Sequence, residues 1–134
     1  MASFVFNSGL GRSVQLADQG SAFVVVLLQA AEADSVLRDY DDLETLLAQA
    51  GNTELVDASY ARKTGLTGTI TLDDTNDDQT VSLADQTFVG LDGSAVVKAL
   101  VCYSLGAGDA NIVPLVASDI SVDPDGSNIT VRMP

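Results

Sequence analysis

The residues best able to do chemistry in this sequence are the carboxylates of one acidic segment, DDTNDD, at positions 73–78. Asp73, Thr75 and Asp77 alternate along it, and calcium-binding loops place their first oxygen ligands at this spacing. The EF-hand pattern then fails, because its sixth position is Asp78 in place of glycine and its twelfth is Ala84 in place of glutamate. The flanking residues also have the alternation of strands, whereas an EF-hand loop joins helices. We therefore expect a solvated loop, with a calcium site at Asp73, Thr75 and Asp77 as the alternative.

Groups that enzymes use as nucleophiles and bases are scarce. The sequence has no histidine, and its one cysteine, Cys102, lies in the apolar run VVKALVCY, which predicts a buried and inert thiol. Carboxylate pairs can hydrolyse glycosides, but the acidic residues here cluster in loops without aromatic neighbours, and the chain has no tryptophan. Glycine motifs for phosphate or dinucleotides are missing as well. We expect a protein that is not an enzyme and uses no cofactor.

The charge balance is strongly acidic. There are 19 acidic and 6 basic residues, which gives a net charge of −13. Such a chain repels nucleic acid and anionic membranes, because affinity for DNA comes largely from neutralised phosphates. The apolar run at 22–28 is too short to span a bilayer, and the N-terminus lacks the pattern of a secretory signal. We expect one soluble, non-secreted domain that binds neither nucleic acid nor membrane.

The segment Tyr60 to Lys63 places two of the six basic residues, Arg62 and Lys63, beside an aromatic side chain. This combination could bind phosphate or the acidic edge of another subunit. The alternative is a solvated turn whose tyrosine packs on a sheet, and we favour that interpretation.

The elements that position these residues are mostly strands. The stretch Gly65 to Phe88 predicts one long hairpin, because apolar residues alternate with threonines on both sides of the acidic loop. The runs at 23–28, 95–103 and 112–117 are continuous and apolar, as in strands buried on both faces. Pro114 within the third run indicates an edge strand or a bulge. The residues at 120–122 and 129–133 alternate again around an Asp-Pro-Asp-Gly turn.

A helical insertion is expected near residues 34–50. A short helix begins at Asp34, and a second one begins at Asp41, because Glu44 stands three residues later as in a capping box. Leucines at 43, 46 and 47 share one helical face with Ala50, and Gly51 stands where a helix commonly ends.

The overall prediction is a mainly β (α+β) fold: an antiparallel sandwich or barrel of about seven to eight strands with this short insertion. Residues 1–20 are expected to form an extended arm before a single β-rich domain at 21–134. The arm is either an edge strand of its own domain, which we favour, or a tail that reaches a neighbouring subunit.

Five segments together resemble a family of small structural proteins of tailed bacteriophages: DDLETLLAQAGNTE, YARKT, DDTNDDQTVSLADQTF, LVCY and IVPLVASDISVDPDGSNIT. The relatives show a helix leading into YARK, a DDTND loop, a D-x-T-[WF] element, an LLVCYD strand and a V-x-PDGSDIT ending. The resemblance covers about residues 23 to 131 in the same order. This chain departs from the pattern with Ser104 in place of an aspartate and with Phe88 where relatives often carry tryptophan.

The resemblance implies a non-enzymatic virion protein made in the cytoplasm of the host bacterium. The preferred expectation is a capsid decoration (cement) protein on the head exterior, which bridges capsomers and stabilises the shell. Its partner is then the major capsid protein, and a trimer is the favoured homo-oligomer. The alternatives are a head–tail connector or tail component that forms a ring, and a calcium-dependent module that binds the host surface. The expected contact residues are Phe4, Phe6 and Arg12 in the arm and Tyr60, Arg62 and Lys63.

Overall fold

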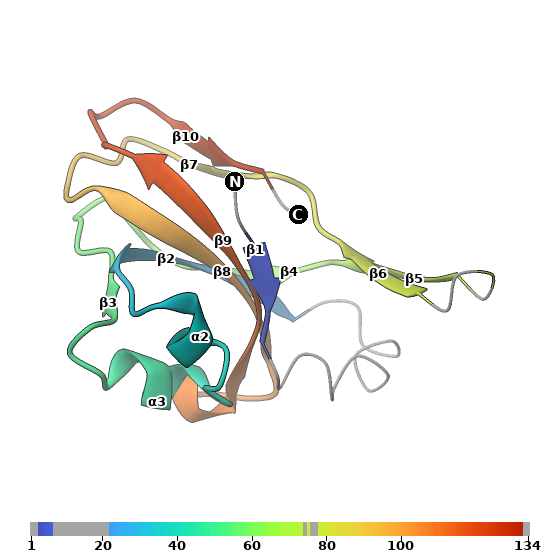
Figure 1. The fold of residues 1–134 in the computed structure, drawn as a ribbon. Coiled ribbons are helices and arrows are strands. Elements are labelled where there is room, and N and C mark those ends of the chain that lie inside the picture. Colours follow the sequence, from blue (N-terminus) through green and yellow to red (C-terminus); the bar gives the residue numbers. More distant parts are fainter. Residues whose placement is uncertain (1–2, 7–21, 74, 76–77, 133–134) are drawn as a thin grey trace.

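The computed structural model describes residues 3–6, 22–73, 75 and 78–132, which contain ten strands, two short α-helices and one 3-10 helix (Figure 1). In chain order these are β1 (Ser3–Val5), β2 (Phe23–Ala30), α2 (Asp34–Leu37), α3 (Leu43–Leu47), β3 (Thr53–Glu54), β4 (Lys63–Leu66), β5 (Thr69–Asp73), β6 (Asp78–Ser82), β7 (Gln86–Phe88), β8 (Val96–Ser104), η1 (Asp109–Asn111), β9 (Ile112–Val122) and β10 (Ile129–Val131).

The centre of the fold is a six-stranded antiparallel sheet with the order β1-β9-β8-β2-β3, in which β4 also pairs with β2. β2 and β8 pair over six residues, from Phe23 opposite Tyr103 to Leu28 opposite Lys98. Both strands are buried on both faces, since Val24 of β2 and Leu100 of β8 enter one core while Val25 of β2 and Ala99 of β8 enter another. This burial explains why their sequences are continuous apolar runs.

One face of the sheet is covered by the two helices. Leu37 of α2 and both Leu43 and Leu46 of α3 are fully buried against this face. Asn52 ties the insertion together, because its side chain accepts a hydrogen bond from the Glu32 amide at 2.8 Å and donates one to the Leu46 carbonyl at 3.0 Å. The helical segment is therefore fixed on the sheet by leucines and by one buried amide.

The opposite face is covered by a two-stranded sheet of β7 and β10. Phe88 of β7 and Val131 of β10 are buried in the same core as Val25 and Leu27 of β2. The resulting layers are helices, large sheet and small sheet, a sandwich-like arrangement (Figure 1). The mainly β, antiparallel class predicted from the sequence is confirmed.

The predicted long hairpin at 65–88 is divided. β5 and β6 pair over five residues, from Thr69 opposite Ser82 to Asp73 opposite Asp78, and project from the body as a ribbon (Figure 1). Below them the two arms separate, because β4 joins the large sheet and β7 joins β10. This separation contributes to the ten described strands, where about seven to eight were predicted.

The structure tests two local predictions, the N-cap of the second helix and the position of Pro114. The helix at 43–47 is capped by Asp42, whose carboxylate accepts the Thr45 amide at 2.7 Å, so the predicted cap at Asp41 was wrong by one residue. Pro114 lies at a bulge, since Cys102 is opposite Pro114 while Val101 is opposite Val116. Among the described residues, no helix has the length and apolar character that crossing a membrane requires.

Candidate functional site

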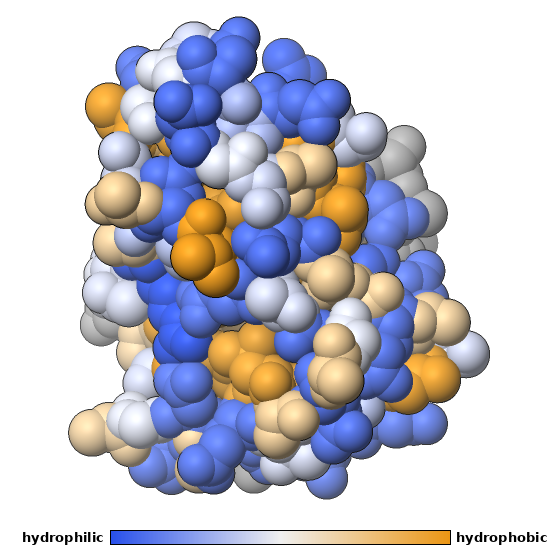
Figure 2. Space-filling view, turned by 90° about the vertical axis from the view of Figure 1, so that its left-hand side faces the viewer, coloured by the Kyte–Doolittle hydropathy of each residue, from blue (hydrophilic) through white to orange (hydrophobic). Residues whose placement is uncertain are grey.

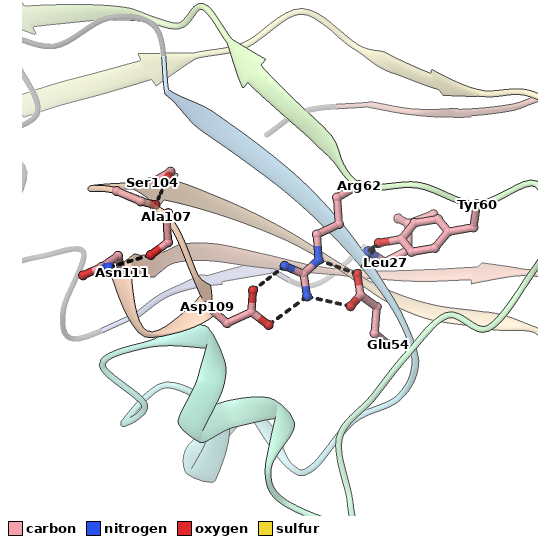
Figure 3. Close-up of polar contacts among 9 residues, drawn as sticks. Leu27, Glu54, Tyr60, Arg62, Ser104, Ala107, Asp109 and Asn111 are labelled. Carbon is pink, nitrogen blue, oxygen red and sulfur yellow. Dashed lines mark hydrogen bonds and ion pairs between the residues drawn. The ribbon is translucent and has the colours of Figure 1, made fainter.

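The polar contacts of this protein concentrate where the chain passes along one edge of β2. β3 pairs with β2 at Leu28 and β4 pairs with it at Val25, so a gap lies between the two partner strands. The hydroxyl of Tyr60 occupies this gap and accepts a hydrogen bond from the buried Leu27 amide at 3.1 Å (Figure 3). A buried amide without a partner costs about 1–3 kcal/mol, so the tyrosine hydroxyl replaces the missing strand.

Arg62 lies next to this tyrosine, between two carboxylates (Figure 3). Its Nε and Nη2 donate to the two oxygens of Glu54, each at 2.7 Å. Its Nη1 and Nη2 donate to Asp109 at 2.6 and 3.1 Å. The planar guanidinium matches two carboxylates at once, a geometry that the point charge of lysine does not reproduce.

Electrostatics in this cluster favour the charged forms of the ion pair and the neutral form of the tyrosine. The hydrogen bond from Arg62 lowers the pKa of Asp109, against a smaller opposing effect of burial. Burial raises the pKa of Tyr60, and the adjacent Glu54 carboxylate raises it further, although the Leu27 hydrogen bond opposes this. The Tyr60 hydroxyl therefore stays protonated and donates to Glu54 at 2.8 Å. A base or nucleophile needs a pKa near the working pH, whereas this hydroxyl makes its hydrogen bonds with Leu27 and Glu54 within the fold.

A second ionic cluster lies on the helix side of the sheet. Lys98 of β8 donates to Asp34 at 2.7 Å and to Asp119 at 2.5 Å, and its side chain is 7% exposed. Burial lowers the pKa of Lys98, but the hydrogen bonds to Asp119 and Asp34 outweigh it, and the net shift is upward. The ammonium and the Arg38 guanidinium both lie over the ring of Phe4, at 5.4 and 5.5 Å from its centroid. This cluster joins the first helix, β1, β8 and β9.

Cys102 is fully buried in the core on the helix side. Burial raises the pKa of its thiol to about 12. The predicted burial of the thiol is confirmed, and because the thiolate is the reactive form, the raised pKa disfavours its reaction.

The expected contact residues of the arm have other roles in the described structure. Phe6 is fully buried in the helix-side core, and its amide donates to the Leu115 carbonyl at 2.8 Å. Phe4 is half-buried, opposite Ala117 in the pairing of β1 with β9. The favoured expectation, an edge strand of the home domain, holds for residues 3–5. Phe6 as a partner contact was wrong, because its ring fills the core, and Arg12 lies outside the described residues.

The segment Tyr60 to Lys63 is partly exposed, and its aromatic and basic side chains contact other residues of the chain. Tyr60 stacks on Phe88 with ring centroids 6.0 Å apart, as the packed-tyrosine interpretation predicts, and Lys63 lies over the same ring at 5.2 Å. Arg62 is held by Glu54 and Asp109, so these side chains are engaged within the chain. Their assignment as partner contacts stays a prediction.

The acidic loop is described in part. Asp73 ends β5, and Thr75 is an exposed turn residue, while Asp77 lies outside the described residues. Within the described part of the chain, no group of three His, Cys, Asp or Glu side chains is arranged to hold a metal ion. The calcium hypothesis for this loop is therefore an open prediction.

The carboxylates that complete both clusters were missed by the sequence analysis. These carboxylates lie in four separate segments that share no sequence pattern: Asp34, Glu54, Asp109 and Asp119. The composition offered one indication of these pairs. A charged side chain in a buried run needs a partner of opposite charge, and this chain has 19 acidic residues. This indication predicts a pair for Lys98 without saying which acid forms it.

No family model, curated protein or solved structure matches this chain. In both clusters the cation is matched by two carboxylates from other elements, and among the described residues every buried polar side-chain atom has a hydrogen-bond partner. The arrangement links strands and helices that are distant in sequence.

Proposed function

We propose that this protein is a non-enzymatic structural component of a tailed-phage particle, with capsid decoration as its role. The observation that carries the proposal is the ordered set of sequence segments, from the leucine helix to the PDGSNIT ending, which resembles small virion proteins of that kind. The role is to add contact area between capsomers on the outside of the head, with the major capsid protein as partner.

The surface chemistry supports an exterior position. Of the basic residues that the structure describes, Arg62 and Lys98 are in ion pairs within the fold, so their charge is not free to attract an acidic partner. Exposed acidic residues include Asp39, Asp41 and Glu44 around the helices. Figure 2 shows a face dominated by hydrophilic residues, with apolar residues in separate patches. An acidic surface repels the packaged DNA inside a head. On the outside of the shell it faces no packaged DNA.

The packing of the fold also supports a structural role. The central sheet is covered on both faces, and the ion pair of Lys98 with Asp34 joins β8 to the helical insertion. A rigid domain loses little conformational freedom when it binds, so more of its contact energy appears as affinity.

The test is the copy number and location of the chain in purified particles. Heads are separated from tails on a density gradient, and this chain is quantified against the major shell protein. Hundreds of copies with DNA-filled heads support decoration. A few copies, or migration with tails, overturn decoration in favour of a connector or tail ring, and absence from both fractions overturns the virion role.

A second experiment starts from particles assembled without this chain. The purified protein is added back, and its occupancy on the head is measured. Val56 and Val89 are the most exposed large apolar side chains described, at 72% and 65%. Their replacement by aspartate is expected to lower occupancy on the head if they face the shell. Ala58→Asp, at an exposed neighbouring position, is the matched control for added charge.

A further inference from the structure

An apolar groove lies between the second half of β9 and β10. Its volume is about 530 Å³, and its lining includes Ile120 and Val122 from β9 with Ile129 and Val131 from β10. Ile120, Val122 and Ile129 are partly exposed. A groove of this size falls in the range of about 300–1,000 Å³ in which proteins bind ligands.

Both walls of the groove have strand edges without a described partner strand. β10 pairs with β7 on one side alone. β9 pairs with β1 at 116–118, so in the described residues its edge at 119–122 is not covered by β1. Free edges beside an apolar groove are the surfaces to which an extended strand adds.

The hairpin of β5 and β6 has the complementary properties. Its two strands pair with each other, and within the described residues neither pairs with a third strand. Its sequence alternates apolar Ile70 and Leu72 with threonines, a period that predicts one apolar face. An isolated two-stranded ribbon is marginally stable in water, so this hairpin gains stability from a surface that covers it.

The charges of the groove and of the hairpin are also complementary. Among the five basic residues that the structure describes, Arg62 and Lys98 are in ion pairs, and Arg38 and Lys63 lie over aromatic rings. Arg132, exposed at the lip of the groove, has no ion pair within the described residues. The hairpin strands carry aspartates at 73 and 78.

We propose that the groove between β9 and β10 binds the β5–β6 hairpin of a second copy of this chain. The hairpin of the same copy projects away from the end of β9 (Figure 1), and β4 and β7 anchor its base in the two sheets. Its own groove is therefore out of reach. A hairpin on one side and a groove on another form a head-to-tail interface, which closes into a ring when the rotation between copies permits.

This inference goes beyond the proposed function, because it concerns the purified chain without any particle. The test mixes two single-cysteine additions: Ser121→Cys, at an exposed position that lines the groove, and Thr80→Cys, in β6. The native Cys102 is buried and stays out of the oxidation. Mild oxidation is expected to yield a disulfide-linked pair of one chain of each type, detected by mass. Ser59→Cys, exposed in the turn before Tyr60, is the matched control and should form few links with either partner.

A charge reversal gives an independent readout. Sedimentation of the full chain over a concentration range is expected to show association that Arg132→Glu weakens and that Asp73→Lys with Asp78→Lys also weakens. Mixing the two reversed chains should restore association, since opposite charges then face each other. A chain that stays monomeric at every concentration, or cross-links that form equally at Ser59→Cys, would overturn the proposal. Either result leaves the decoration role to be decided by copy number on particles.

Discussion

Arg62 and Asp109 are 47 positions apart in the sequence, and two hydrogen bonds of 2.6 and 3.1 Å join their guanidinium and carboxylate groups. The contact connects the end of the loop before β4 to the start of the 3-10 helix before β9. In the sheet order β8 and β2 lie between β9 and β4, so the contact joins two loops that strand pairing does not bring together. Its contribution to stability is therefore a test of how the fold is assembled.

Replacing Arg62 by alanine is expected to destabilise the protein by about 2 kcal/mol. Exposed ion pairs contribute less than about 1 kcal/mol, and breaking a buried pair costs about 3–5 kcal/mol. The Arg62 and Glu54 side chains are each 23% exposed, which places the cluster between these limits. Denaturant unfolding measures the change. A double-mutant cycle with Asp109→Ala should show coupling between the two positions, and strictly additive effects would contradict the contact.

Low pH is expected to weaken the same contact. The pKa of Asp109 is lowered in the folded state by its hydrogen bond from Arg62, so the folded chain holds this proton less tightly than the unfolded chain. Its contribution is present above the unfolded pKa of about 3.9 and is lost as the pH falls through the lower folded value. Unfolding measured from pH 6 down to acid should show a smaller loss for Asp109→Asn than for the native chain.

Phe6→Ala is expected to cost about 3–5 kcal/mol, the range for removing a large buried aromatic side chain. Phe4→Ala should cost less, because its ring is half-buried at the edge of the sheet. Thermal and denaturant unfolding of the two variants provide the comparison. Equal, small effects at both positions would mean that Phe6 does not pack in the helix-side core.

The helix cap distinguishes two neighbouring aspartates. Asp42→Ala removes the carboxylate that accepts the Thr45 amide and is expected to cost about 1 kcal/mol. Asp41→Ala is the matched control, since it removes the same charge from the exposed preceding position. A larger loss at Asp41, measured by unfolding, would restore the cap that the sequence pattern suggested.

Alkaline pH is expected to destabilise the protein in part through Cys102. The thiol has a pKa of about 12 in the folded state and about 8.5 in an unfolded chain. Above about pH 8.5 the unfolded chain loses this proton first, so the free energy of unfolding falls until about pH 12. Cys102→Val should show a shallower decline across this window. A thiol reagent at pH 8 should label the native chain slowly and the unfolded chain at once; fast native labelling would contradict the burial.

The sequence by itself determined the strand-rich class and the positions of the principal elements. The runs at 23–28 and 95–103 are continuous and apolar because both faces of their strands are buried, and this pattern is local. The leucine spacing at 43–47 likewise determined which helical face packs on the sheet.

Tertiary structure alone decided which carboxylates those are and where the arm lies. Glu54 and Asp109 reach Arg62 because β3, the loop before β4 and the loop before β9 meet in the folded chain, and strand order is not encoded in the residues around each acid. Phe6 is buried because β1 pairs with β9, a contact across more than 100 residues. The predicted hairpin divides for a similar reason: β4 pairs with β2 and β7 pairs with β10, so its two arms belong to different sheets, and Leu66 and Phe88 pack against the core between them. Periodicity reports which residues share a face, whereas the partner of that face is a property of the whole chain.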